Sequence, residues 1–281
     1  MKFRLAQDAR PQATLLLTAA VISVGLWFIP FAELLTYPFR LFVTFIHEGG
    51  HAIAALLTGN SVESLSIATN ASGETYTSQG GTISQIFVAS AGYLSSMAYG
   101  ALLLVLIRRS FAARAVLIGS AVVVLFLTLI YGLYKPIVSG IALSGIPFTL
   151  LAGTLLSIGL ILVARLANSK VATFFVSFLA VQCILNALLD LKTVFFLSSP
   201  FAPSVPTDAV NMANATGIPA MFWAATWVAI AVGLLVLAMR VYVTSRNRGL
   251  QSDMTFGELG MGEFSRPVLP ETSKTSDLSF Q

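Results

Sequence analysis

Three side chains that could do chemistry stand together in an apolar stretch, FIHEGGHAIAALLTG, at residues 45–59. They are His47, Glu48 and His51, and the chain has 2 histidines in all. Residues i and i+4 lie on one face of a helix, so His47 and His51 can hold one metal ion. Imidazole nitrogen suits zinc, which lowers the pKa of a bound water to about 7. Glu48 is then placed to take the proton of that water, so the pattern predicts a metal-dependent hydrolase.

The two histidines leave one ligand position to fill, because a catalytic zinc ion usually takes three protein ligands and a water. Cys183 is the 1 cysteine of the chain, and its apolar neighbours indicate an inert buried thiol. The third ligand should therefore be a carboxylate. Asp190 is the first candidate because it ends an apolar segment, and Asp208, in a proline-rich stretch, is the alternative. The remaining candidates are Glu33, which we place at a membrane interface, Glu63 and Glu74.

The composition places these residues in a membrane protein. The chain is 56% hydrophobic and 10% charged, whereas soluble domains carry about 25% charged residues. Its net charge of +4 does not indicate nucleic-acid binding, because the basic residues lie at the ends of apolar runs, where they meet lipid headgroups. A bilayer span needs about 20 apolar residues. The predicted spans are 14–32, 38–58, 83–107, 115–134, 146–164, 171–191 and 220–243.

Two connections and the tail differ from these spans. Residues 60–82 alternate polar and apolar side chains around an Asn-Ala-Ser-Gly turn, which predicts a β-hairpin. Residues 197–220 are rich in proline and should form a loop, and the polar tail at 244–281 should be disordered outside the membrane. We expect an all-α polytopic membrane protein with about six to seven transmembrane helices and a small hairpin after the H-E-x-x-H helix. Its membrane-embedded domain should cover residues 1–243.

The distribution of basic residues indicates how the chain is oriented across the membrane. If all seven predicted spans cross and the N-terminus is cytoplasmic, most basic clusters fall outside, against the positive-inside rule. One segment that enters without crossing would bring nearly all of them to the cytoplasmic side. We therefore hypothesise that the histidine segment or the hairpin is re-entrant, which is tolerated where protein or a water cavity covers it.

HEGGHAIAALLTG resembles the H-E-x-G-H-A-x-A-A core of the site-2 protease family, the intramembrane zinc metalloproteases. NALLD, at residues 186–190, resembles the Asn-containing segment of that family that ends in Leu-Asp, although Leu191 follows where the family usually has glycine. The stretch TDAVNMANATGIPAMFWAATW resembles the compact bacterial and plastid branch. The resemblance implies His47, His51 and Asp190 as zinc ligands, Glu48 as catalytic base, and Asn186 as a residue that positions substrate.

The leading hypothesis is an intramembrane zinc metalloprotease that hydrolyses membrane-embedded protein substrates in a bacterial plasma membrane. Its partners would be those substrates and the lipid bilayer. The alternative is a non-proteolytic relative, a membrane protein that has a metal site and that binds or regulates other membrane proteins. Structural zinc sites usually have four protein ligands, and three good candidates are visible, which favours the protease. An ion transporter would need further carboxylates along its spans, and the sequence offers almost none.

Overall fold

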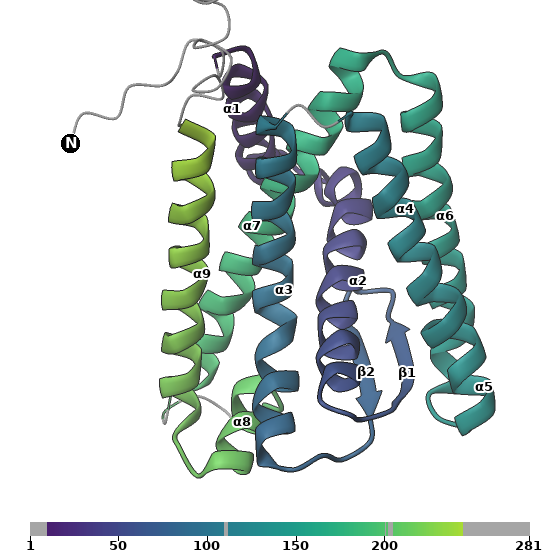
Figure 1. The fold of residues 1–281 in the computed structure, drawn as a ribbon, viewed down its shortest axis with the longest axis vertical. Helices are drawn as coiled ribbons and strands as arrows, with labels where there is room; N and C mark the ends of the chain where they lie inside the picture. The colour runs from purple at the N-terminus through teal and green to yellow at the C-terminus, as the bar shows by residue number, and fades with distance from the viewer. Residues whose placement is uncertain (1–9, 110–111, 200, 202–204, 244–281) are drawn as a thin grey trace, which may run out of the picture. The chain divides into compact units, whose positions relative to one another are not determined.

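A computed structural model describes residues 10–109, 112–199, 201 and 205–243, which form a bundle of helices with one small β-sheet (Figure 1). The predicted architecture, helical with a hairpin after the histidine segment, is confirmed. The predicted tail at 244–281 lies outside the described residues. The α-helices are α1 (Arg10–Gly25), α2 (Glu33–Leu57), α3 (Thr82–Arg108), α4 (Ala113–Leu129), α5 (Lys135–Ser139), α6 (Ile146–Leu166), α7 (Ser169–Leu197), α8 (Asp208–Thr216) and α9 (Ala220–Val243). The strands are β1 (Val62–Ile67) and β2 (Gly73–Thr77).

Five helical segments of the described residues are long and apolar enough to cross a membrane, a count near the predicted six to seven. They are Thr82–Arg108, Ala113–Ser139, Leu143–Leu166, Ser169–Leu197 and Ala220–Tyr242. Large apolar side chains on their outer faces are exposed, which suits a lipid environment. Examples are Val122, Phe126, Leu151, Leu155, Ile230 and Leu237. The chain is therefore an integral membrane protein with several spans.

The first two predicted spans differ from these five. The apolar part of α1, Ala13–Gly25, is shorter than a full span. Helix α2 carries Glu33, Arg40 and the charged motif along its length, and most residues of its second half are buried. Glu33 and Arg40 are exposed, whereas the polar groups of the motif, His47, Glu48 and His51, face protein and a cavity.

Helix α2 packs closely on α3 because both helices carry small residues where they meet. A Cβ atom at Gly50 would come within 2.7 Å of the Ala91 carbonyl oxygen. Farther along α3, a Cβ atom at Gly100 would lie 3.1 Å from the Ala180 carbonyl oxygen of α7. The small residues of α3 thus let it approach α2 and α7, the close approach that their spacing suggests.

The hairpin lies beside the C-terminal half of α2 (Figure 1). Its strands pair antiparallel, with Leu65 opposite Thr75 and Ile67 opposite Gly73. The turn contains Ala71 at a φ of 64°, and the side chain of Asn70 accepts a hydrogen bond from the Ser72 N–H at 3.0 Å. An Asn side chain that bonds the backbone two residues on stabilises such a turn. The hairpin predicted from alternation and turn residues is thus present.

The two outer edges of this hairpin differ. The outward N–H of Ile67 in β1 donates to the Thr149 hydroxyl at 2.9 Å, and the outward carbonyl of Glu63 accepts from Ser139 at 3.1 Å. Neighbouring helices therefore close the β1 edge. In β2 the outward positions are Gly73, Thr75 and Thr77, because Ser72 and Ser78 on either side bond inward to Ala68 and Ser61. No described residue donates to or accepts from the outward backbone groups of those three, so the β2 edge is free.

Candidate metal centre

The histidines of the motif lie one turn apart in the buried half of α2, with their Nε2 atoms 3.1 Å apart. On the other side of its ring, His51 Nδ1 is 2.7 Å from the Val88 carbonyl oxygen of α3. A carbonyl can only accept, so Nδ1 carries a proton and Nε2 is the nitrogen that remains for a metal ion. A hydrogen bond of this kind fixes the tautomer and the orientation of a metal-ligating histidine. His51 is therefore set up to ligate through Nε2.

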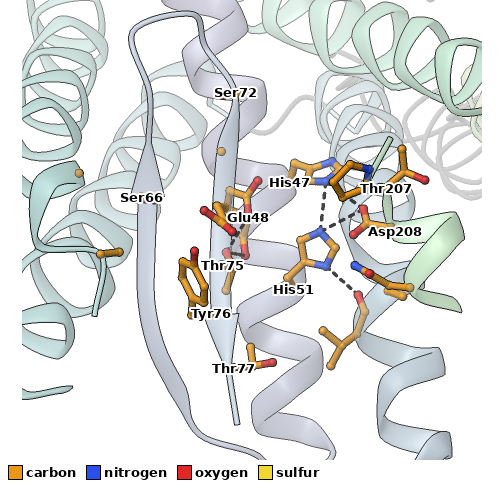
Figure 2. A pocket seen from close by; sticks show the side chains of 18 of the residues that line it. His47, Glu48, His51, Ser66, Ser72, Thr75, Tyr76, Thr77, Thr207 and Asp208 are labelled. Atoms are coloured by element: carbon orange, nitrogen blue, oxygen red, sulfur yellow. Dashed lines mark hydrogen bonds and ion pairs between the residues drawn. The ribbon is translucent and has the colours of Figure 1, made fainter. Parts of the chain in front are cut away.

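Asp208 faces both histidines from α8 (Figure 2). Its Oδ2 lies 3.5 Å from His51 Nε2 and 3.7 Å from His47 Nε2. One ligand atom from each of the three residues lies within 4.8 Å of the other two, and the group could hold a metal ion. The structure thus brings together both predicted histidines and the alternative carboxylate of the sequence analysis.

The position of Asp208 follows from how α8 begins. Thr207 caps the helix, since its side chain accepts a hydrogen bond from the Val210 N–H at 3.3 Å. Asp208 is the first helical residue, where the helix dipole favours a negative charge. Burial of this carboxyl opposes ionisation, but hydrogen bonds and charge interactions with His47 and His51 outweigh it and lower its pKa below the usual range. The two histidines therefore favour the ionised carboxylate, which is the form that can bind a metal ion.

The spacing of the three ligand atoms fits zinc. Four ligand atoms at about 2.1 Å from a zinc ion in tetrahedral geometry lie about 3.4 Å from one another. The three separations here are 3.1, 3.5 and 3.7 Å. Two imidazole nitrogens and one carboxylate oxygen are also a ligand set that catalytic zinc sites use, with the fourth position left to water or substrate.

Two residues of α3, Gly92 and Tyr93, lie against the rings of the histidines. Gly92 lies so close that a Cβ atom there would collide with the Nε2 atoms of both His47 and His51. The ring of Tyr93 packs edge-on against the His47 imidazole, with the ring centroids 4.7 Å apart. A glycine at this place makes room for the two rings, and the tyrosine limits how the His47 ring can turn.

Glu48 lies beside the histidines but turns toward the hairpin. Its carboxylate Oε2 accepts a hydrogen bond from the Thr75 hydroxyl of β2 at 2.7 Å, and the residue is 4% exposed. Figure 2 shows Glu48 between α2 and β2, with the histidines pointing to Asp208 on the other side. Glu48 directly follows His47 and lines the same cavity as the two histidines and Asp208.

The cluster opens into a cavity of about 1190 Å³. His47, Glu48, His51 and Asp208 line it, together with all residues of β2. Asn211 and Asn214 of α8 also line it, and the wall is rich in hydroxyl and amide groups. Such a cavity can hold water and an extended segment of polypeptide next to the cluster.

Two residues predicted for the site lie elsewhere on α7. Asp190 is exposed and is absent from the three-residue cluster and from the cavity wall, although its charge is within electrostatic reach of His47 and Arg40. The amide of Asn186 donates to the Gln182 carbonyl oxygen at 2.8 Å, and Asn186 does not line the cavity either. Roles for Asp190 as ligand and for Asn186 in positioning substrate stay predictions.

The proline-rich composition predicts a loop at 197–220, and the structure instead has helix α8 within it, for which the sequence also contains local signals. Thr207 is a residue type favoured at a helix start, and Gly217, with a φ of 72°, ends the helix in the left-handed conformation. The roles of Gly92 and Thr75 could not be found in this way, because each depends on a contact between elements distant in sequence.

A family model described as Peptidase M50B-like matches residues 14–238 of the chain. The matched region contains α2, the hairpin and α8, and so all residues of the cluster. Neither the curated proteins nor the solved structures give a significant match.

Proposed function

The chain belongs to the Peptidase M50B-like family, and on that premise we propose that it is an intramembrane zinc metalloprotease acting on membrane-embedded protein substrates. The observation that supports this most directly is the cluster of His47, His51 and Asp208 beside a buried glutamate. Membership of the site-2 protease family makes a membrane metalloprotease the expected class. The cluster supplies the ligand set that such an enzyme requires.

We assign His47 and His51 through Nε2, and Asp208 through its carboxylate, as the residues that hold zinc. A bound zinc ion would polarise the peptide carbonyl and lower the pKa of water at the site to about 7. We favour Asp208 over Asp190 as the third ligand because Asp208 is the carboxylate within ligand distance of both imidazoles.

Glu48 acts as general base and then as general acid. It takes one proton from the attacking water as the water oxygen adds to the carbonyl carbon. It then gives that proton to the peptide nitrogen as the C–N bond breaks, so the products are a free amine and a carboxylic acid, which loses its proton to water at neutral pH. The position of Glu48 at the cavity wall, one residue from His47, supports this role.

The free edge of β2 is the surface on which the substrate backbone is held. A transmembrane helix must unwind before one of its peptide bonds can be attacked, and its exposed backbone groups then need partners. The outward backbone groups of Gly73, Thr75 and Thr77 offer such partners along the cavity. Pairing by strand addition gives affinity through main-chain hydrogen bonds. We place this reaction in the plasma membrane of a bacterium.

The test is cleavage of a synthetic single-span peptide with a fluorophore–quencher pair, reconstituted with the purified protein in phosphatidylcholine vesicles. Glu48→Gln should lower kcat by at least about 10²-fold, the usual contribution of a general base, while zinc content stays at the wild-type level. Glu33→Gln, an exposed carboxylate at the start of the same helix, is the matched control and should cleave normally. Equal cleavage by Glu48→Gln and wild type would contradict the mechanism. A wild-type protein that binds zinc and cleaves nothing would favour the non-proteolytic alternative.

A further inference from the structure

Thr75 occupies the middle of β2 and faces α2. Its Oγ1 lies 2.7 Å from Glu48 Oε2 and 3.2 Å from the Glu48 backbone oxygen. A hydroxyl has one proton to donate, and the shorter distance to a charged acceptor assigns that proton to the carboxylate. Among the described residues, this is the hydrogen bond that the Glu48 side chain accepts.

Gly73, the neighbour of Thr75 on the same face of β2, leaves space for the same carboxylate. A Cβ atom at Gly73 would come within 2.5 Å of Glu48 Oε1 and 2.6 Å of its Cγ. The strand therefore has no side chain at position 73, which leaves space for Glu48, and a hydroxyl donor at position 75. Together they form a seat that fits the Glu48 side chain.

We propose that Thr75 is a positioning residue for the general base, with Gly73 providing the space that this position requires. The proposal rests on the proposed function. With Oε2 tied to Thr75, the glutamate is fixed beside His47 and Oε1 is left to accept the proton of the water. Thr75 itself touches neither substrate carbonyl nor metal through its side chain.

The seat also connects substrate binding to the base. The backbone of Thr75 lies on the free edge that we assign to the substrate strand, while its hydroxyl holds Glu48. A substrate strand that pairs with β2 would restrict the motion of Thr75. Because the Thr75 hydroxyl is bonded to Glu48, the carboxylate of Glu48 would be restricted as well. The same strand thus aligns the scissile backbone and the carboxylate that acts on the water.

The test compares Thr75→Val, which keeps the shape of the side chain and removes the donor, with Thr75→Ser, which keeps the donor. Valine also suits a strand, so folding should be preserved, as the unfolding temperature will report. Using the vesicle assay above, Thr75→Val should lower kcat by about 10- to 100-fold with KM and zinc content near wild type, since hydrogen bonds to charged groups are worth about that factor. Thr75→Ser should restore kcat to within about threefold. Gly73→Ala should lower kcat as Thr75→Val does.

Thr128→Val is the matched control, because its buried hydroxyl also donates to an oxygen, the Val124 carbonyl of its own helix, away from the cavity. It should leave kcat unchanged. The proposal is overturned if Thr75→Val has a kcat equal to or above that of wild type. It is also overturned if Thr75→Ser is as impaired as Thr75→Val. A kcat above wild type would mean that Thr75 holds Glu48 away from the reaction.

A second measurement does not depend on cleavage. Dicyclohexylcarbodiimide modifies carboxyl groups in apolar surroundings, and mass spectrometry can quantify its addition to Glu48. Thr75→Val should increase this labelling several-fold, while Thr75→Ser and Thr128→Val match wild type. Equal labelling in all four proteins would contradict the proposed role of Thr75 in positioning Glu48, even if the protein is a protease. Absence of cleavage in wild type, with labelling that changes as stated, would instead contradict the proposed function and leave the seat standing.

Discussion

Two aspartates on different helices, Asp208 and Asp190, differ in how they are placed relative to the histidines of α2. Asp208 begins α8, and its carboxylate lies 3.5 Å from His51 Nε2. Asp190 lies within α7 and is exposed, outside the three-residue cluster. The start of a short capped helix can thus direct a carboxylate into a cavity, where the helix dipole and two imidazoles stabilise its charge. Asp190 lies far from the start of α7 and has no such support from its own helix, and it acts on His47 through its charge.

The largest expected effect comes from Asp208→Ala. Loss of a ligand should lower zinc affinity by more than about 100-fold, because even partners outside the ligand shell cost about 10- to 100-fold. Zinc content of the purified variant, measured by mass spectrometry of the metal, should fall to background. A zinc content equal to wild type would reverse the roles given to the two aspartates.

Gly92→Ala should weaken zinc binding by about 10-fold or more, because the added methyl group would collide with both imidazoles and displace them. Gly119→Ala is the matched control, since a Cβ atom there meets nothing within 4 Å. Competition with a chelator of known affinity measures the effect. If the two variants bind zinc equally, the histidines are not held against α3 in the metal-bound protein.

Capping residues test whether the start of α8 positions its aspartate. Thr207→Ala removes the cap of α8, and Asn168→Ala removes the corresponding cap of α7, which accepts from the Val171 N–H at 2.9 Å. Each loss should cost about 1 kcal/mol of stability. Thr207→Ala should also lower zinc affinity by several-fold, and Asn168→Ala should leave it unchanged. Equal zinc affinities would show that the cap does not orient Asp208.

The smallest effect is expected from Asp190→Asn. An exposed charge interaction contributes about 0–1 kcal/mol, so zinc affinity should change by less than about fivefold. The chelator competition used for Gly92→Ala measures it. Loss of zinc from this variant would restore Asp190 as a ligand, as the resemblance implies.

Much of this arrangement could be predicted because it depends on local sequence. Long apolar runs indicated the membrane helices, alternation around Asn70 indicated the hairpin, and four-residue spacing brought His47 and His51 onto one face. Each of these features follows from residues close together in the chain. Hydropathy and periodicity report such features well.

The rest of the site depends on contacts over long sequence distances. No periodicity connects Thr75 with Glu48, or Gly92 with the histidines, since each pair belongs to different elements. The sequence favours Asp190 over Asp208 because Asp190 ends an apolar segment, whereas Asp208 lies in a proline-rich stretch. The capping threonine and terminal glycine of α8 were the local signals of a helix there, but its direction toward α2 is set by packing on α3 and α9.

The most direct test of the zinc site is X-ray diffraction from crystals of the zinc-loaded protein at the zinc absorption edge. An anomalous peak should lie about 2.0–2.2 Å from His47 Nε2, His51 Nε2 and a carboxylate oxygen of Asp208. The proposed zinc site would be contradicted by a peak that Asp190 coordinates in place of Asp208, or by the absence of a peak between the histidines.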